Sequence, residues 1–493
     1  MSRRFAASPR PCIAESPALP RDVRSWVVTF LAVTAAYLLT SDALFPFYGV
    51  WQIPLFVGVL AAMIASSYLQ AGVVAVAGLA LMQVISPPVA AQAPLGPGGW
   101  LLSLGLVAAF SLGVGYVRAN GGLPRKTFAV GVSTALVALA LVNMWVPLFA
   151  GGIPLTGYGP LKASTISEVP KAGQYVNDDA IYRRVFYLMH SGMPYYQAFK
   201  KAWLGLQRTP ALPRSVAAYR LPTMYWLWTL LPADAFLIII VFLAFASVGV
   251  VAASFVTGQL VGVRYAPLAA LALACYAASL STTVYMTYVD LPAACMALVG
   301  IALFVRASVT EDDRWLYAAA ATLALAALTR EILAYLIVFA ALSALLQPAG
   351  KRLRRAVPWL VALGAFALGY AGHVVAVQEF IGTRSGTISY LGGSPAFALD
   401  AIRRFSSRIV DGGIALPVLF LLGVLGAWAS HLRTGRPFAA FAVASLVIPV
   451  VAMIKLGNPG IDEPGLQVNY WGNLFVPLAL SLWPVSATLL PGA

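Results

Sequence analysis

The sequence predicts an all-α polytopic membrane protein with about fourteen transmembrane helices. Of its 493 residues, 60% are hydrophobic and only 10% are charged, which is too little charge to cover the surface of a soluble protein of this size. Residues 26–39, 237–256 and 416–429 carry no charged side chain. About 20 apolar residues are enough to cross a bilayer as a helix, so these runs predict membrane spans.

Residues 1–24 are basic and rich in proline, and we expect them to form a cytoplasmic tail. The apolar run that follows ends without a small-residue cleavage site, so it predicts a retained helix and not a signal peptide. We expect extra transmembrane helices over residues 25–118 and a transmembrane core over residues 119–493. The expected spans are 25–44, 51–69, 71–89, 100–118, 127–148, 234–257, 266–285, 289–306, 315–330, 332–347, 357–378, 413–430, 437–454 and 471–490.

The Lys and Arg residues of the tail and the short connections predict the orientation. With fourteen spans they share one side, the cytoplasm, and both termini lie there too. Three longer extracytoplasmic loops of a plasma-membrane protein are then expected near 149–233, 379–412 and 455–470. Most Asp and Glu residues also fall outside, so we expect any chemistry at the outer face. The cations of the short connections are Arg118, Arg125, Lys126, Lys351, Arg352, Arg354, Arg355, Arg433 and Arg436.

The formal net charge of +15 is interpreted as this topology together with attraction to anionic membrane lipids. We therefore expect no nucleic-acid partner. The three cysteines and three histidines are far apart in the sequence, so they indicate neither a structural zinc site nor a disulfide framework.

A polar stretch, residues 177–199, interrupts the apolar chain in the first large outside loop. It predicts two short helices, with Asp178 and Asp179 in the first turn of the first helix and Gly192 as its stop. The second helix is expected to be amphipathic and to lie on the membrane surface. The two carboxylates are about 100° apart around a helix, so at most one faces a cavity squarely, and both could simply cap the helix.

The arginine pair in this stretch and a later arginine, Arg220, each have two interpretations. Arg183 and Arg184 could hold a phosphate, or one of them could pair with Asp179 one turn earlier. Arg220 precedes a run with Tyr225, Trp226 and Trp228. It could bind phosphate, or it could anchor an interfacial aromatic belt.

Taken together, these pieces resemble the GT-C glycosyltransferases, in the branch of the protein O-mannosyltransferases and aminoarabinose transferases. The resemblance covers roughly residues 127–490. The matching elements of the first loop are Asp178-Asp179, Tyr182, Gly192-Met193-Pro194-Tyr195-Tyr196, Arg220-Leu221-Pro222 and Tyr225-Trp226. Weaker matches are Asp290 before Pro292, Arg330-Glu331, and residues 469–473. The chain departs from the family in its extra N-terminal spans and in Asn473, where many relatives carry an arginine.

The resemblance implies transfer of a sugar from a polyprenyl-phosphate donor to a glycan, lipid or protein acceptor, with inversion. Asp178 would be the general base, with Asp179 in reserve. Arg220 and Arg330 would bind the donor phosphate, and Tyr182, Arg183 and Tyr195 would also contact substrate. Asp290 would orient the acceptor or support a divalent metal, although this chemistry requires no metal. Two structural alternatives are open: Asp290 could cap a helix, and Arg330 could pair with Glu331.

The main alternative is a lipid or glycan transporter or flippase without transferase activity. Transporters often contain repeats and charges at the membrane midplane. This sequence shows no repeat, and its acids cluster at one face. These observations argue against ion coupling but leave a lipid flippase open. A third alternative is a non-catalytic assembly factor that retains the family's loop.

Overall fold

The computed structural model describes residues 26–30, 52–65, 67–85, 96–120, 124–149, 178–206, 216, 219–232, 235–281, 289–381, 394–403, 415–455 and 470–489. In this part of the chain it has eighteen α-helices and no strand. Six helices are long and apolar enough to cross a membrane, and five shorter apolar helices accompany them. The predicted all-helical class with several apolar spans is therefore confirmed at this level.

Each expected span from 51–69 onward coincides with a helix; the first, 25–44, is described only over residues 26–30. The largest difference at a start is in α16, which begins at Ala349 and not at the expected residue 357. Lys and Arg residues in this added segment favour helix. The helices are α2 (Gln52–Ile64), α3 (Tyr68–Ile85), α5 (Gly96–Asn120), α6 (Arg125–Phe149), α11 (Ala235–Leu260), α12 (Ala266–Ser281), α13 (Asp290–Thr310), α14 (Asp313–Thr329), α15 (Ala334–Ser343), α16 (Ala349–Gln378), α18 (Ala415–Ala429), α20 (Arg436–Met453) and α21 (Val476–Leu482). A 3₁₀ segment, η9 (Trp483–Leu489), continues α21.

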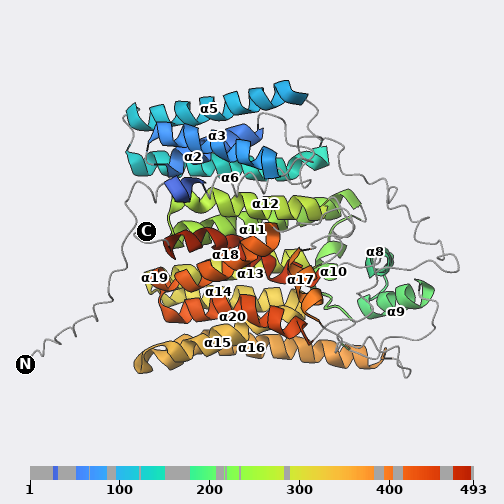
Figure 1. Ribbon diagram of the computed structural model, residues 1–493. Coiled ribbons are helices and arrows are strands. Elements are labelled where there is room, and N and C mark those ends of the chain that lie inside the picture. The colour runs from blue at the N-terminus through green and yellow to red at the C-terminus, as the bar shows by residue number, and fades with distance from the viewer. Residues whose placement is uncertain are drawn as a thin grey trace, which may run out of the picture.

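The long helices run side by side in one bundle (Figure 1). Helices α2, α3 and α5 lie on one side of it, and α15 and α16 lie on the opposite side. Helix α13 is central and mostly buried, whereas most of α16 is not buried inside the protein. The exposed face of α16 is apolar, with Leu360, Val361, Leu368 and Val375 all more than half exposed. Such a face is suited to contact with lipid chains.

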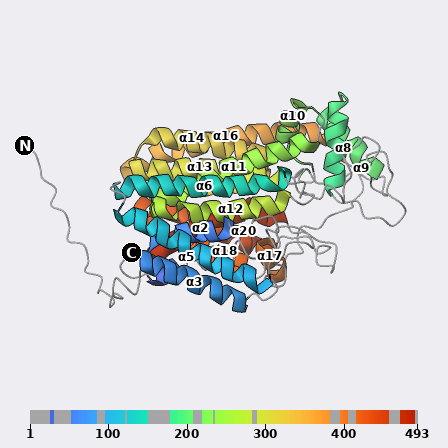
Figure 2. The same cartoon turned by 90° about the horizontal axis from the view of Figure 1, so that it is seen from above.

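Short helices lie beyond one end of this bundle, as Figure 2 shows for α8 (Asp178–His190), α9 (Tyr195–Leu206) and α10 (Thr223–Thr229). The two predicted helices of the polar stretch are confirmed as α8 and α9. Gly192 joins them with φ of 91°, a left-handed conformation that favours glycine. Helix α9 is amphipathic, because Phe199 is buried while Lys200 and Lys201 are exposed.

Cations gather at the opposite end of the bundle. The end of α16 meets α9, where the rings of Tyr196 and Phe380 stack with centroids 6.1 Å apart. The start of this 30-residue helix is therefore far from α9. There Arg354 and Arg355 both pair with Asp313, the first residue of α14. Helix α19 (His431–Thr434), which is followed by the cationic start of α20, also lies at this end (Figure 1).

Candidate functional site

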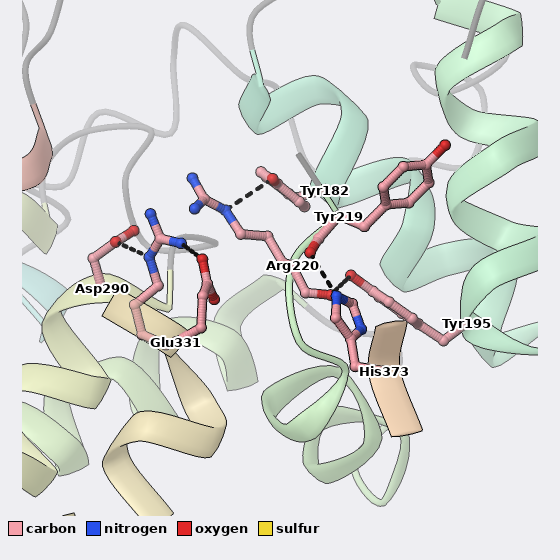
Figure 3. A network of polar contacts seen from close by, with 8 residues as sticks. Tyr182, Tyr195, Tyr219, Arg220, Asp290, Glu331 and His373 are labelled. Carbon is pink, nitrogen blue, oxygen red and sulfur yellow. Dashed lines mark hydrogen bonds and ion pairs between the residues drawn. The ribbon is translucent and has the colours of Figure 1, made fainter. Parts of the chain in front are cut away.

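Arg220 is held from both sides by two of the tyrosines that the sequence analysis selected. Its side-chain Nε donates to the hydroxyl oxygen of Tyr182 on α8 at 3.0 Å. Its backbone carbonyl accepts from the hydroxyl of Tyr195 on α9 at 2.7 Å. All three residues are buried. A buried guanidinium with a fixed Nε is oriented, so its remaining N–H donors point in a defined direction, as Figure 3 shows.

An aromatic cluster supports this arrangement. Tyr225 on α10 packs with Tyr195, with ring centroids 5.1 Å apart, and with Tyr182 at 5.9 Å. Burial raises the pKa of Tyr195 and of Tyr225 well above the ordinary tyrosine value. The negative charge of Glu331 adds a smaller increase to the pKa of Tyr195. The charge of Asp290 does the same for the pKa of Tyr225. Both hydroxyls therefore stay protonated near neutral pH.

Asp290, Arg330 and Glu331 form a buried ion cluster at the same end. Helices α13 and α14 are antiparallel neighbours, so the first residue of α13, Asp290, meets the residue that ends α14, Arg330. The Nε of Arg330 lies 2.6 Å from the Oδ1 of Asp290, and its Nη1 pairs with the Oε1 of Glu331. Asp290 and Arg330 are 0% and 2% exposed. The extended backbone of Arg330, with φ of −142° and ψ of 103°, ends the helix and places this cation inside.

The two carboxylates each retain one oxygen with unused hydrogen-bonding capacity. Asp290 Oδ2 and Glu331 Oε2 are buried without a hydrogen-bond partner among the residues that the structure describes. A buried carboxylate oxygen without a donor is energetically costly. Both oxygens are therefore suited to accept a hydrogen bond from a substrate hydroxyl. In the described ranges, no group of three or more His, Cys, Asp or Glu side chains is placed to hold a metal ion.

His373 belongs to a second polar network that the sequence analysis did not predict. Its Nε2 lies 3.1 Å from the backbone carbonyl of Tyr219, and its Nδ1 lies 2.8 Å from the hydroxyl of Tyr196. A carbonyl can only accept, so Nε2 carries the proton and Nδ1 accepts from Tyr196. Burial raises the pKa of Tyr196 to about 12, which keeps this donor protonated. The network fixes α9 and the segment before α10 against α16.

A third polar contact joins the final segment to the bundle near the site. The hydroxyl of Tyr276 on α12 donates to the Oδ1 of Asn473, and both side chains are buried. Asn473 lies in a 3₁₀ segment, η8 (Tyr470–Leu474), which precedes α21. The asparagine that departs from the family pattern is therefore a hydrogen-bonding partner inside the bundle.

The structure brings together five of the eight predicted site residues in two contacting sets: Tyr182, Tyr195 and Arg220, and Asp290 with Arg330. The local alternative for Arg330, pairing with Glu331, is also observed. The backbone of Asp178, Asp179 and Arg183 forms the first turns of α8, but their side chains lie outside the described residues. Their predicted roles as base and substrate ligand stay predictions.

Comparison with family models, with curated proteins and with solved structures gave no match for this chain.

Proposed function

We propose that this protein is an integral membrane glycosyltransferase of the GT-C kind, which transfers a sugar from a polyprenyl-phosphate donor. One observation carries the proposal. Residues selected by the resemblance, from Tyr182 to Arg330, come from separate elements and converge at one end of the bundle. The acidic pair begins α8 at the same end. A site of this kind offers carboxylates for an acceptor and guanidinium groups for a phosphate.

In the proposed topology the chain crosses a plasma membrane about fourteen times, and the shorter apolar helices also span it. The cations near Asp313 and on α20 lie at the end opposite the site. Basic residues in short connections favour the cytoplasmic side, which supports a site at the extracytoplasmic face and both termini in the cytoplasm.

The proposed reaction needs a base and counter-charge. The acceptor hydroxyl gives its proton to the Asp178 carboxylate. Its oxygen forms a bond to the anomeric carbon while the bond from that carbon to the phosphate oxygen breaks. The electron pair leaves with the polyprenyl phosphate, and displacement from the opposite face inverts the anomeric configuration.

The two buried arginines have different roles in this mechanism. Arg330 is already bound by two carboxylates, so it serves mainly to hold Asp290. Asp290 Oδ2 then faces the acceptor. The Nε of Arg220 donates to the hydroxyl of Tyr182, which orients the guanidinium group. In this mechanism Arg220 stabilises the charge of the leaving phosphate.

Replacing Asp178 with Asn is expected to lower sugar transfer by at least about 100-fold, because the base is lost while the shape is kept. Lipid extraction from a deletion strain first identifies the accumulated polyprenyl-phosphate sugar. That lipid is then supplied to the purified protein in liposomes, and the released polyprenyl phosphate is measured. Asp312→Asn is the control, because Asp312 caps α14 at the far end and Asn caps equally well.

Normal transfer by Asp178→Asn would move the base to Asp179 or Asp290. If Asp178→Asn, Asp179→Asn and Asp290→Asn all retained transfer, the carboxylate mechanism would be rejected. A wild-type protein that moves the intact lipid-linked sugar across the bilayer without releasing polyprenyl phosphate would favour the flippase alternative.

A further inference from the structure

A cationic groove of about 750 Å³ lies between α8, α9 and Phe380, which is two residues beyond the end of α16. Its positive lining comes from Arg184 on α8 and from Lys200 and Lys201 on α9. Leu204 and Phe380 give it apolar walls. The described residues that line it include three cations and no Asp or Glu, although the exposed Glu379 precedes Phe380 in the chain. An anion is the ligand that such a field favours.

Arg184 supplies a second, independent indication of an anion. Its Nη1 atom is buried and has no hydrogen-bond partner among the described residues. A buried donor on a charged group is costly when it is left unpaired, and a phosphate oxygen would pair with it. Lys200 also lies over the Phe380 ring, with its Nζ 5.8 Å from the ring centroid.

The length of α16 places this groove at the depth of lipid headgroups. Four cations at residues 351–355 mark the polar start of the helix. The exposed apolar face runs from Leu360 to Val375, and about 20 helical residues cross the hydrocarbon layer. Phe380 lies five positions after Val375, or roughly 7 Å along a helix axis. The headgroup region of the second leaflet begins at about this level.

The surroundings of the groove also indicate a membrane surface. On α10, which packs beside α8 and α9, Trp226 is 56% exposed, and Leu230, just after the helix, is 79% exposed. Exposed aromatic and apolar side chains at the end of a bundle are typical of the bilayer interface. A ligand with a phosphate and apolar chains would match both the cations and the walls of the groove.

We propose that this groove binds the phosphate group of an anionic membrane phospholipid. The phosphate oxygens pair with Arg184, Lys200 and Lys201, while the acyl chains extend along the exposed face of α16. The bound lipid would hold α8 and α9 on the bundle beside the candidate site. This inference does not rest on the proposed glycosyltransferase activity.

Native mass spectrometry of the full-length protein tests the proposal, with phosphatidylglycerol as the anionic probe and phosphatidylcholine as the neutral one. We expect the wild type to bind phosphatidylglycerol preferentially. The double variant Lys200→Gln/Lys201→Gln should bind it about 30-fold more weakly. The matched variant Lys200→Arg/Lys201→Arg keeps both charges and should bind it like the wild type. Gln197→Glu adds a negative charge at an exposed position in the groove and should also weaken binding.

The Gln197→Glu variant keeps the test decisive if the double variant fails to fold, because an exposed side chain tolerates this change. Equal affinity of the wild type and the charge-altered variants for phosphatidylglycerol would overturn the proposal. It would also be overturned if inorganic phosphate at millimolar concentration displaced the lipid and stabilised the protein equally well, since the ligand would then be a soluble phosphate.

Discussion

The Arg330→Gln variant should lose about 3–5 kcal/mol of its free energy of unfolding, because the change leaves buried carboxylates without their cation. Arg330 is 2% exposed and pairs with Asp290, which is 0% exposed, and with Glu331. Glutamine can still donate hydrogen bonds, but it carries no charge and cannot neutralise either carboxylate. Denaturant unfolding in mixed micelles, followed by tryptophan fluorescence, measures the difference from the wild type.

The same substitution at Arg354 provides the control. Arg354 also pairs with an aspartate, Asp313, but its side chain is 74% exposed and lies at the opposite end of the bundle. Solvent screens this pair, and Arg355 remains beside the same carboxylate, so we expect a loss of at most about 1 kcal/mol. Equal losses for the two variants would show that the Arg330 cluster is not buried as described.

A double-mutant cycle separates the pair from its surroundings. Asp290→Asn removes the charge that Arg330 neutralises, and the combined variant Asp290→Asn/Arg330→Gln should lose less stability than the sum of the two single losses. We expect a coupling energy of about 0.5–3 kcal/mol. Additive losses would mean that the 2.6 Å contact between Arg330 and Asp290 contributes little.

The sequence was sufficient to predict the helices because hydropathy depends on local composition. Membrane spans need long apolar runs, and each expected span from 51–69 onward coincides with a helix. The short helices α8 and α9 were predictable for a similar reason, since Gly192 and Pro194 separate two amphipathic segments. These signals all lie within a few residues of the feature that they specify.

The contacts within the candidate site could be predicted only in part. The sequence indicated Tyr182, Arg220, Asp290 and Arg330 separately, and Glu331 was an evident local partner for Arg330. That Arg330 also pairs with Asp290, 40 positions away, follows from the packing of α13 on α14, which hydropathy does not specify.

The His373 network had no sequence signal at all. His373 and Tyr196 are 177 positions apart, and a single histidine in an apolar helix has no distinctive pattern. The same limit applies to the pair of Tyr276 and Asn473, which are 197 positions apart. Side-chain orientation between distant helices is set by tertiary packing, so these contacts became evident only from the structure.

Gly426→Ala is expected to destabilise the protein by about 1–3 kcal/mol or more, because α18 and the end of α21 approach too closely for a side chain. A Cβ atom at Gly426 would lie 1.9 Å from the backbone oxygen of Leu482, and one at Gly423 would lie 2.7 Å from the Cα of Ala479. Backbone atoms cannot rotate away as a flexible side chain would, so the two segments must separate.

Gly364→Ala is the matched control, since a Cβ atom at this position on α16 meets nothing within 4 Å. Alanine favours helix over glycine by up to about 1 kcal/mol, so this variant should be as stable as the wild type or slightly more stable. In detergent, the midpoint of thermal unfolding should therefore fall for Gly426→Ala and stay the same or rise slightly for Gly364→Ala. Equal midpoints for the two variants would contradict the close packing of α18 on α21.

The Gly426→Ala substitution is also expected to disturb the candidate site from a distance. Helix α21 directly follows η8, which carries Asn473, and Asn473 accepts the hydrogen bond from Tyr276 beside the start of α13. If α18 pushes α21 outward, Asn473 moves with it, and the wall of the site next to Asp290 loosens. Gly426→Ala should then lower sugar transfer in protein that is still folded, whereas Gly364→Ala should leave transfer unchanged.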